Sequence, residues 1–194
     1  MNNLPSSRSD LSARGKWIGA AGWIILLVGA GAAVLPMMER RGGAVTVGIL
    51  LALTGILEFL AGSLRHEARP LAMLTGAVTI LAGSMFATEA ATRFFLPAVT
   101  IVMGWLFIRA ALLALTSRLT TGGVRRWTLI SSATDFLLAL VLLVGLQIAS
   151  LVVALIGVTG PLVASFAWVL ALSFAATGLM LLEVASCARA SEEV

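Results

Sequence analysis

The stretch WTLISSATDFLLALVLLVGLQ, residues 127–147, decides the class of this protein. It is apolar almost throughout, and its one ionisable side chain is Asp135. At a rise of about 1.5 Å per residue, an α-helix of about 20 apolar residues crosses a hydrocarbon core about 30 Å thick. The stretch therefore predicts a helix that spans a membrane.

Five other stretches approach or meet the same criterion, which places most of the chain inside a bilayer. Of the 194 residues, 60% are hydrophobic and 11% are charged, whereas about a quarter of an ordinary soluble domain is charged. A small soluble domain lacks the volume to bury so much apolar surface. We therefore expect an all-α membrane protein with six transmembrane helices. The predicted spans are 17–37, 44–63, 70–88, 95–117, 127–147 and 161–186.

The basic residues lie singly or in pairs between these spans, a pattern that indicates membrane topology and not contact with a nucleic acid. One set of alternating connections carries Arg8, Arg14, Lys16, Arg65, Arg69, Arg118, Arg125, Arg126 and Arg189, whereas the other carries Arg40, Arg41 and Arg93. Because cytoplasmic loops are enriched in Lys and Arg, both termini should be cytoplasmic. We expect a flexible N-terminal tail at 1–15, the transmembrane domain at 16–188 and a C-terminal tail at 189–194.

Small residues recur at intervals of seven within the spans, which returns them to nearly one helix face, where another helix can pack closely. The intervals predict a two-helix hairpin of roughly 55 residues present three times, as in some transporters. Glycines placed by chance in a Gly-rich chain are the alternative. The residues that we expect to pack closely are Gly22, Gly29, Gly48, Gly55, Gly76, Gly83, Ser132 and Gly178, with Gly104/Ala110 and Ala171 in the remaining spans.

The third hairpin contains an additional apolar stretch, residues 148–160, which carries no charge. A loop with exposed backbone cannot lie in lipid. The stretch should therefore form an interfacial helix, extend the fifth span or fold back as a re-entrant segment.

Three ionisable residues lie inside the spans, and each is a candidate functional residue because a charge in hydrocarbon is costly. Arg109 and Asp135 lie about 12 Å from the cytoplasmic ends of their spans, and Glu58 about 8 Å. Consecutive antiparallel spans bring Arg109 and Asp135 to one level. We predict a buried ion pair between them, with Glu58 nearby or facing a polar cavity.

Two interpretations of these charges remain open. In the structural one, the pair fixes helix order and orientation. In the functional one, Glu58 and Asp135 take up and release protons, and Arg109 is their shared counter-charge. We favour the structural interpretation.

No other residues predict a catalytic, metal or cofactor site. A single cysteine, Cys187, cannot form an internal disulfide, and a single histidine, His66, lies in a predicted loop. No serine occupies a recognisable catalytic setting. We expect no cofactor, no enzymatic activity and no soluble substrate. The expected partners are the lipid bilayer and, since small-residue faces permit it, a second copy of the chain.

The chain resembles the HdeD family of small bacterial inner-membrane proteins over roughly residues 14–188. Trp127, Ser132 and Asp135 match that family's tryptophan at a helix start, its small-residue position and its aspartate before apolar residues. The segments GILEFLAG and GWLFIRAAL match a weaker pattern of glycine and aliphatic residues. The family usually has glycine at the position of Ser132, the stretch 148–160 looks like an insertion, and Arg109 matches no family motif.

The resemblance implies a protein of the bacterial inner membrane with a role in resistance to acid or general stress. Such a protein would act by stabilising the membrane or by contacting other proteins. The alternative hypothesis is a small proton-coupled transporter or channel that uses Glu58, Arg109 and Asp135. A proton-flux measurement in liposomes distinguishes the two.

Overall fold

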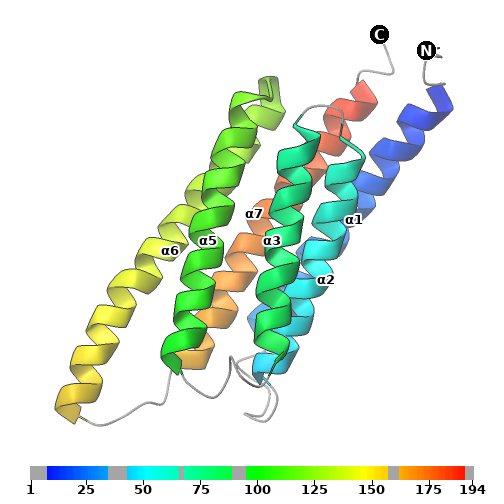
Figure 1. The fold of residues 1–194 in the computed structure, drawn as a ribbon. Coiled ribbons are helices and arrows are strands. Elements are labelled where there is room, and N and C mark those ends of the chain that lie inside the picture. The colour runs from blue at the N-terminus through cyan, green and yellow to red at the C-terminus, as the bar shows by residue number, and fades with distance from the viewer. Residues whose placement is uncertain (1–7, 35–42, 66–67, 89–94, 157–161, 191–194) are drawn as a thin grey trace.

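The protein is a bundle of long α-helices, as the computed structural model shows (Figure 1). The structure describes residues 8–34, 43–65, 68–88, 95–156 and 162–190. Within these residues there are six helices that are long and apolar enough to cross a membrane, and no strands. This confirms the predicted fold class. The helices are α1 (Arg8–Val34), α2 (Gly43–Ser63), α3 (Arg69–Ala87), α5 (Phe95–Arg118), α6 (Gly122–Ile156) and α7 (Leu162–Ala190).

The largest differences from the predicted helix boundaries are at the start of α1 and at the end of α6. Helix α1 begins at Arg8, so residues 8–15 are helical, although we expected them in a flexible tail. Leu11, Ala13 and Arg14 favour helix, which lets it continue outward from the apolar span. Helix α6 continues without a break through 148–156, so the additional apolar stretch extends the fifth span as far as the structure describes it.

The helices form a closed ring in chain order, in which α7 returns to pack against α1. The most extensive contacts join α2 to α3, α1 to α7, and α5 to α6. The predicted hairpins instead paired the first span with the second, the third with the fourth and the fifth with the sixth. The structure does not confirm that three-hairpin arrangement.

Small residues explain why α2 and α3 are the closest pair. A Cβ atom added to Gly55 would lie 2.6 Å from the backbone nitrogen of Ile80 and 2.9 Å from the carbonyl oxygen of Gly76. One added to Gly48 would lie 2.9 Å from the carbonyl oxygen of Gly83. The two backbones touch directly at both levels, which requires glycine on both helices.

The α1·α7 pair is built in the same way. A Cβ atom on Gly22 would lie 3.0 Å from the carbonyl oxygen of Gly178, and one on Gly29 would lie 3.3 Å from that of Ala171. The small-residue faces that the sequence predicts on α1 and α7 therefore pack against each other within one chain. Gly104 is different, because nothing lies within 4 Å of an added Cβ, so this glycine does not mediate close packing as expected.

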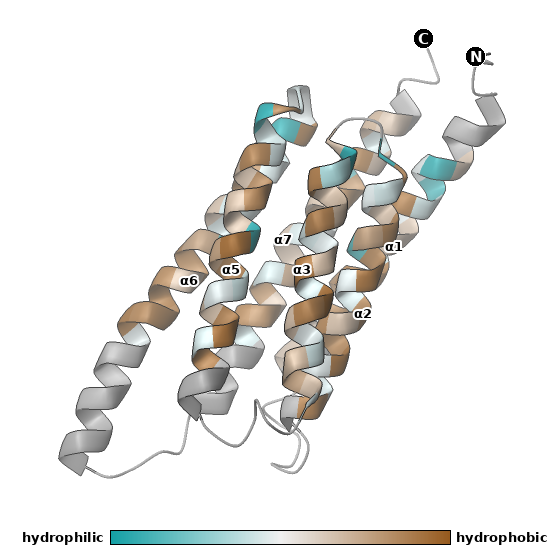
Figure 2. Ribbon diagram, viewed as in Figure 1, coloured by the Kyte–Doolittle hydropathy of each residue, from teal (hydrophilic) through white to brown (hydrophobic). Residues whose placement is uncertain are grey.

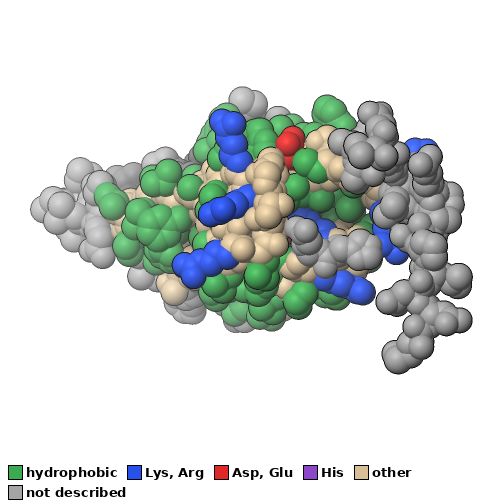
Figure 3. All heavy atoms as spheres, turned by 90° about the horizontal axis from the view of Figure 1, so that it is seen from above, with side chains coloured by type: hydrophobic (Ala, Val, Ile, Leu, Met, Phe, Trp, Pro, Cys, Tyr) green, Lys and Arg blue, Asp and Glu red, His purple; other side chains and the backbone are tan. Residues whose placement is uncertain are grey.

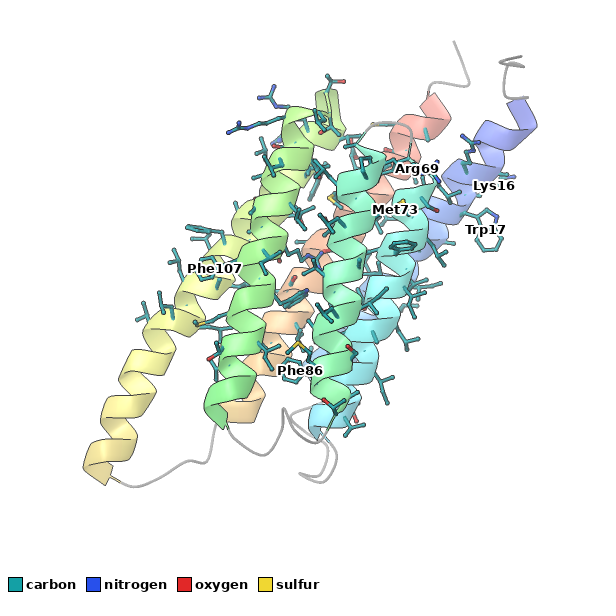
Figure 4. The ribbon with its side chains drawn as sticks, viewed as in Figure 1. Lys16, Trp17, Arg69, Met73, Phe86 and Phe107 are labelled. Carbon is teal, nitrogen blue, oxygen red and sulfur yellow. The ribbon has the colours of Figure 1, made fainter. Side chains whose placement is uncertain are left out.

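Apolar side chains cover the outside of the bundle. Leu27, Leu60, Leu81, Leu137 and Val141 each have more than half of their surface exposed, as membrane-facing residues would. The hydropathy colouring shows apolar residues, in brown, along every helix (Figure 2). On the outer side of the α5·α6 pair, the rings of Phe107 and Phe136 pack edge to face with centroids 5.8 Å apart (Figure 4).

The two ends of the bundle differ in charge. The first turns of α1, the α2–α3 and α5–α6 connections and the end of α7 lie together, and we call this the basic end. Among the described residues, every Lys and Arg except Arg109 belongs to these segments. Viewed from this end, their side chains spread over the surface (Figure 3). Arg40, Arg41 and Arg93, which we assigned to the opposite side, lie outside the described residues.

Candidate functional site

The structure brings Glu58, Arg109 and Asp135 together in the middle of the ring. Nη2 of Arg109 lies 2.6 Å from Oε1 of Glu58, and Nε of Arg109 lies 2.9 Å from Oδ2 of Asp135. Arg109 and Asp135 have no exposed surface, and Glu58 is 6% exposed. We call these three residues the charge cluster. Each comes from a different helix, namely α2, α5 and α6.

Helix α7 supplies two hydroxyl groups to the charge cluster. Nη2 of Arg109 also donates a hydrogen bond to Oγ1 of Thr177, which in turn donates to the carbonyl oxygen of Ser173 at 2.8 Å. The hydroxyl of Ser173 donates to Oδ1 of Asp135 at 2.6 Å. Thr177 and Ser173 are fully buried. Their spacing of four residues places both on one face of the helix.

Helix α3 contacts the other carboxylate through Thr79. The Thr79 hydroxyl lies 3.2 Å from Oε2 of Glu58 and 3.0 Å from the carbonyl oxygen of Thr75, and either oxygen can accept its proton. The indole nitrogen of Trp105 donates to Oγ1 of Thr79 at 3.1 Å. The guanidinium of Arg109 lies 5.5 Å from the centroid of the Trp105 ring, within the range of a cation–π contact.

The charges in this cluster do not balance. Two carboxylates surround one guanidinium, so the three groups carry a net charge of −1 when all are ionised. Three polar atoms of these two residues, Nε and Nη1 of Arg109 and Oδ2 of Asp135, have no hydrogen bond of good geometry among the described residues. The contact at 2.9 Å is thus an ion pair without an aligned hydrogen bond. A buried site of this kind gains free energy from a further positive charge.

A small cavity adjoins Glu58 on the side of the basic end. Its volume is about 20 Å³, enough for a water molecule. The polar residues that line it are Glu58, Arg65, Thr75 and Thr116, together with apolar residues that include Ala72 and Leu113. Asp135 does not line this cavity. Glu58 thus contacts Arg109 and also lines a cavity, two positions that the sequence predicts as alternatives.

Arg65 lies on the outer side of this cavity, just beyond the end of α2. Its side chain is half-buried, and its Nε is enclosed without a hydrogen-bond partner among the described residues. Burial lowers the pKa of Arg65 to about 10, and the nearby charge of Glu58 partly offsets that effect. The Arg65 guanidinium therefore stays charged at neutral pH and places a positive charge between Glu58 and the aqueous phase.

Ser132 contacts the partner helix of α6 and not the charge cluster. Its hydroxyl donates to the carbonyl oxygen of Ala110 at 2.8 Å and so joins α6 to α5 one turn from the Arg109–Asp135 contact. Apart from Gly104 on α5, the glycines predicted as packing residues lie in the α2·α3 and α1·α7 pairs, and they contribute no group to the cluster.

Sequence reasoning missed the hydroxyl and indole groups around the cluster. Thr75 and Thr79 are four residues apart on α3, as Ser173 and Thr177 are on α7. Hydroxyl side chains four residues apart within an apolar span indicate a buried polar face of the helix. We had counted only charged side chains and had therefore expected too few polar groups inside the bundle.

Comparisons with known proteins add no functional assignment. A scan against protein-family models and searches of curated proteins and of solved structures find nothing that matches this chain. Among the described residues, no group of three or more His, Cys, Asp and Glu side chains is arranged to hold a metal ion.

Proposed function

We propose that this chain is a non-enzymatic multi-pass protein of the bacterial inner membrane that supports survival under acid stress, and that its charge cluster responds to acid by binding a proton. Its six apolar helices are consistent with a multi-pass membrane protein. The observation that carries the proposal is that two buried carboxylates share one guanidinium.

The net charge of the cluster is the reason that it would bind a proton. A charge left uncompensated in a membrane interior costs several kcal/mol. A proton on one carboxylate brings the net charge of the three groups to zero, and the second carboxylate still pairs with Arg109. Acidification supplies that proton. The bundle then holds a neutral cluster when the pH is low and a charged one when it is high, so its internal free energy depends on pH.

The resemblance to the HdeD family independently supports a role in acid resistance. Asp135, a residue on which the resemblance depends, belongs to the charge cluster. Acid resistance is the role that the resemblance implies. The proposal thus combines a family expectation with a site that has the chemistry to respond to acid.

The test is survival of acid challenge. Deleting the gene should lower survival at low pH, and the wild-type gene should restore it. Glu58→Gln should not restore it, since the variant keeps an amide oxygen for Arg109 but cannot take up a proton. Gly104→Ala, which changes a residue without close neighbours, is the matched control and should restore survival. Equal survival of the deletion and wild-type strains would rule the proposal out.

The proposed orientation can be tested with the natural cysteine. Cys187 is the one cysteine of the chain, and it is exposed near the end of α7, at the basic end. If that end is cytoplasmic, a membrane-impermeant maleimide should label inverted membrane vesicles and spare intact spheroplasts. The opposite pattern would overturn the orientation.

The cavity beside Glu58 favours a second candidate function, that of a small proton-coupled transporter or channel. The cavity lies between Glu58 and the basic end. In liposomes under a pH gradient, a transporter would move protons, and Glu58→Gln or Asp135→Asn would abolish the flux. If liposomes that contain the wild-type protein show no proton flux, the stress role is the better proposal.

A further inference from the structure

We propose that Asp135, and not Glu58, is the carboxyl group of the charge cluster that binds the proton, and that the Ser131 hydroxyl accepts the hydrogen bond of the protonated acid. Glu58 then keeps its charge and remains the anion that pairs with Arg109. The proton bonds to Oδ2 of Asp135, and the three groups of the cluster then carry no net charge. This inference rests on the proposed proton binding and assigns it to one residue.

The two carboxylates differ in the hydrogen bonds that they accept while they are charged. Oε1 of Glu58 accepts a bond from Nη2 of Arg109 at 2.6 Å, and Oε2 lies 3.2 Å from the Thr79 hydroxyl. Oδ1 of Asp135 accepts a bond from the uncharged Ser173 hydroxyl, whereas Oδ2 has no hydrogen bond of good geometry among the described residues. Hydrogen bonds to the charged form of an acid oppose its protonation. Protonation of Asp135 at Oδ2 therefore breaks fewer of them.

The charges that surround the two carboxylates also differ. Glu58 contacts Arg109 and attracts a second cation, Arg65, which lies across the cavity. The charged groups that act on Asp135 are Arg109 of α5, at 2.9 Å, and Glu58 of α2, which repels it from beyond Arg109. Helix α7 contributes the uncharged hydroxyl of Ser173 at this level. Glu58 thus interacts with two cations and Asp135 with one, so Asp135 is the surplus carboxylate.

Ser131 is placed to accept a hydrogen bond from protonated Asp135. The two residues are four positions apart on α6, so their side chains lie on one face of the helix with Cβ atoms about 6 Å apart. Ser131 has no exposed surface, and its Oγ has no hydrogen-bond partner in the part of the chain that the structure describes. A proton on Oδ2 that points to Ser131 gives a hydrogen bond to two buried oxygens that otherwise lack one.

The chain contains two aspartates, Asp10 and Asp135, which makes a selective test possible. Asp10 lies in the first turn of α1, outside the apolar span. In full-length Asp10→Asn, carboxyl-¹³C aspartate therefore labels Asp135 alone. Infrared difference spectroscopy of this variant in lipid nanodiscs should show, on acidification, the carbonyl stretch of a carboxylic acid that is shielded from water. The band should move to lower frequency in the labelled protein, because the heavier carbon belongs to the protonated group.

The label distinguishes failure of this assignment from failure of the proposed function. A band that keeps its frequency in the labelled protein belongs to a glutamic acid, which overturns the assignment to Asp135 and leaves proton binding by the cluster intact. Absence of any such band refutes the proposed proton binding itself.

Glu58→Gln tests why the proton goes to Asp135. The variant removes the charge that repels Asp135 and leaves one carboxylate for one guanidinium. The labelled band should then require a pH that is lower by about one unit or more. An unchanged pH of protonation would show that Asp135 is not the surplus carboxylate and would overturn the assignment.

The role of Ser131 has its own readout. In Ser131→Ala the carboxyl O–H loses its acceptor, so the labelled band should move to higher frequency. The midpoint of protonation should fall by about 0.5–1 pH unit, the equivalent of one hydrogen bond. The matched control is Ser132→Ala, since the adjacent hydroxyl donates to the carbonyl oxygen of Ala110 and should not affect the band. Equal frequencies in the two alanine variants would overturn the role of Ser131.

Discussion

The α2·α3 pair and the α5·α6 pair are held together by different physical means. Gly48, Gly55, Gly76 and Gly83 bring the backbones of α2 and α3 into direct contact. Between α5 and α6, Gly104 has nothing within 4 Å of an added Cβ, and Arg109–Asp135 and Ser132–Ala110 make the contacts instead. Within lipid, packing of small residues and polar contacts are both able to join helices. In this protein, close backbone contact dominates the α2·α3 pair, to which Glu58 and Thr79 add a polar contact, and polar contacts dominate the α5·α6 pair.

The largest effect should come from removing the shared cation. Arg109→Gln leaves two carboxylates buried without a counter-charge, and we expect a loss of about 3–5 kcal/mol in the free energy of unfolding. The measurement is the loss of helicity during titration with a denaturing detergent. The double variant Arg109→Gln/Asp135→Asn should be more stable than Arg109→Gln alone. If the double variant is no more stable than the less stable of the two single variants, the pairing of Arg109 with Asp135 contributes nothing to stability.

The next effect tests the glycine-packed pair. Gly55→Ala places a methyl group 2.6 Å from the backbone nitrogen of Ile80, so α2 and α3 must move apart. We expect a loss of about 1–3 kcal/mol, as for other overpacked sites. The same detergent titration measures it. A stability equal to that of the wild type would show that the pair tolerates separation and that backbone contact does not hold it together.

Ser132→Ala should have a smaller effect on the polar pair. The variant loses the hydrogen bond to the carbonyl oxygen of Ala110 and keeps a side chain of similar size. Hydrogen bonds between membrane helices contribute about 0.6 kcal/mol on average, and we expect a loss of that order. Ser132→Thr, which retains a hydroxyl group, is the comparison. A loss as large as that of Arg109→Gln would contradict the ranking of the two contacts.

Gly104→Ala should have the smallest effect. An added methyl group meets no atom within 4 Å, so stability should stay within about 0.5 kcal/mol of the wild type. The comparison with Gly55→Ala involves the same substitution in two spans. A strong destabilisation by Gly104→Ala would mean that α5 packs more closely there than the structure shows.

The class of fold was predictable from the sequence because it depends on a single quantity, the length of each apolar stretch. The meeting of Arg109 and Asp135 was also predictable, since both lie at similar depths in consecutive antiparallel helices. The pairing of α1 with α7 was not, because it joins residues far apart in the chain and an interval of small residues does not identify its partner. Glycines at seven-residue intervals occur in α1, α2 and α3 alike, so the sequence alone left open which faces meet.

The environment of the carboxylates was harder to predict for a similar reason. Depth along a helix says how far a charge lies from water and nothing about its direction around the axis. Glu58 therefore had two possible neighbours in the sequence, a cation or a cavity, and the structure gives it both. Thr79 contacts Glu58, and Ser173 contacts Asp135. Threonine and serine are common in apolar helices, and their contacts depend on which helices face each other.

The unbroken course of α6 has a consequence for the surrounding lipid. Its 35 residues make a rod about 52 Å long, and the apolar part from Trp127 onward, about 45 Å long, exceeds the thickness of the acyl-chain layer by about 15 Å. Such hydrophobic mismatch is relieved by leaning, by local thickening of the bilayer or by burial of the far end among headgroups. Asp135 lies on this same helix, so any change in its lean moves one member of the buried acid–base set. The acyl-chain length of the surrounding lipids should thus affect the tilt of α6 and, through it, the position of Asp135.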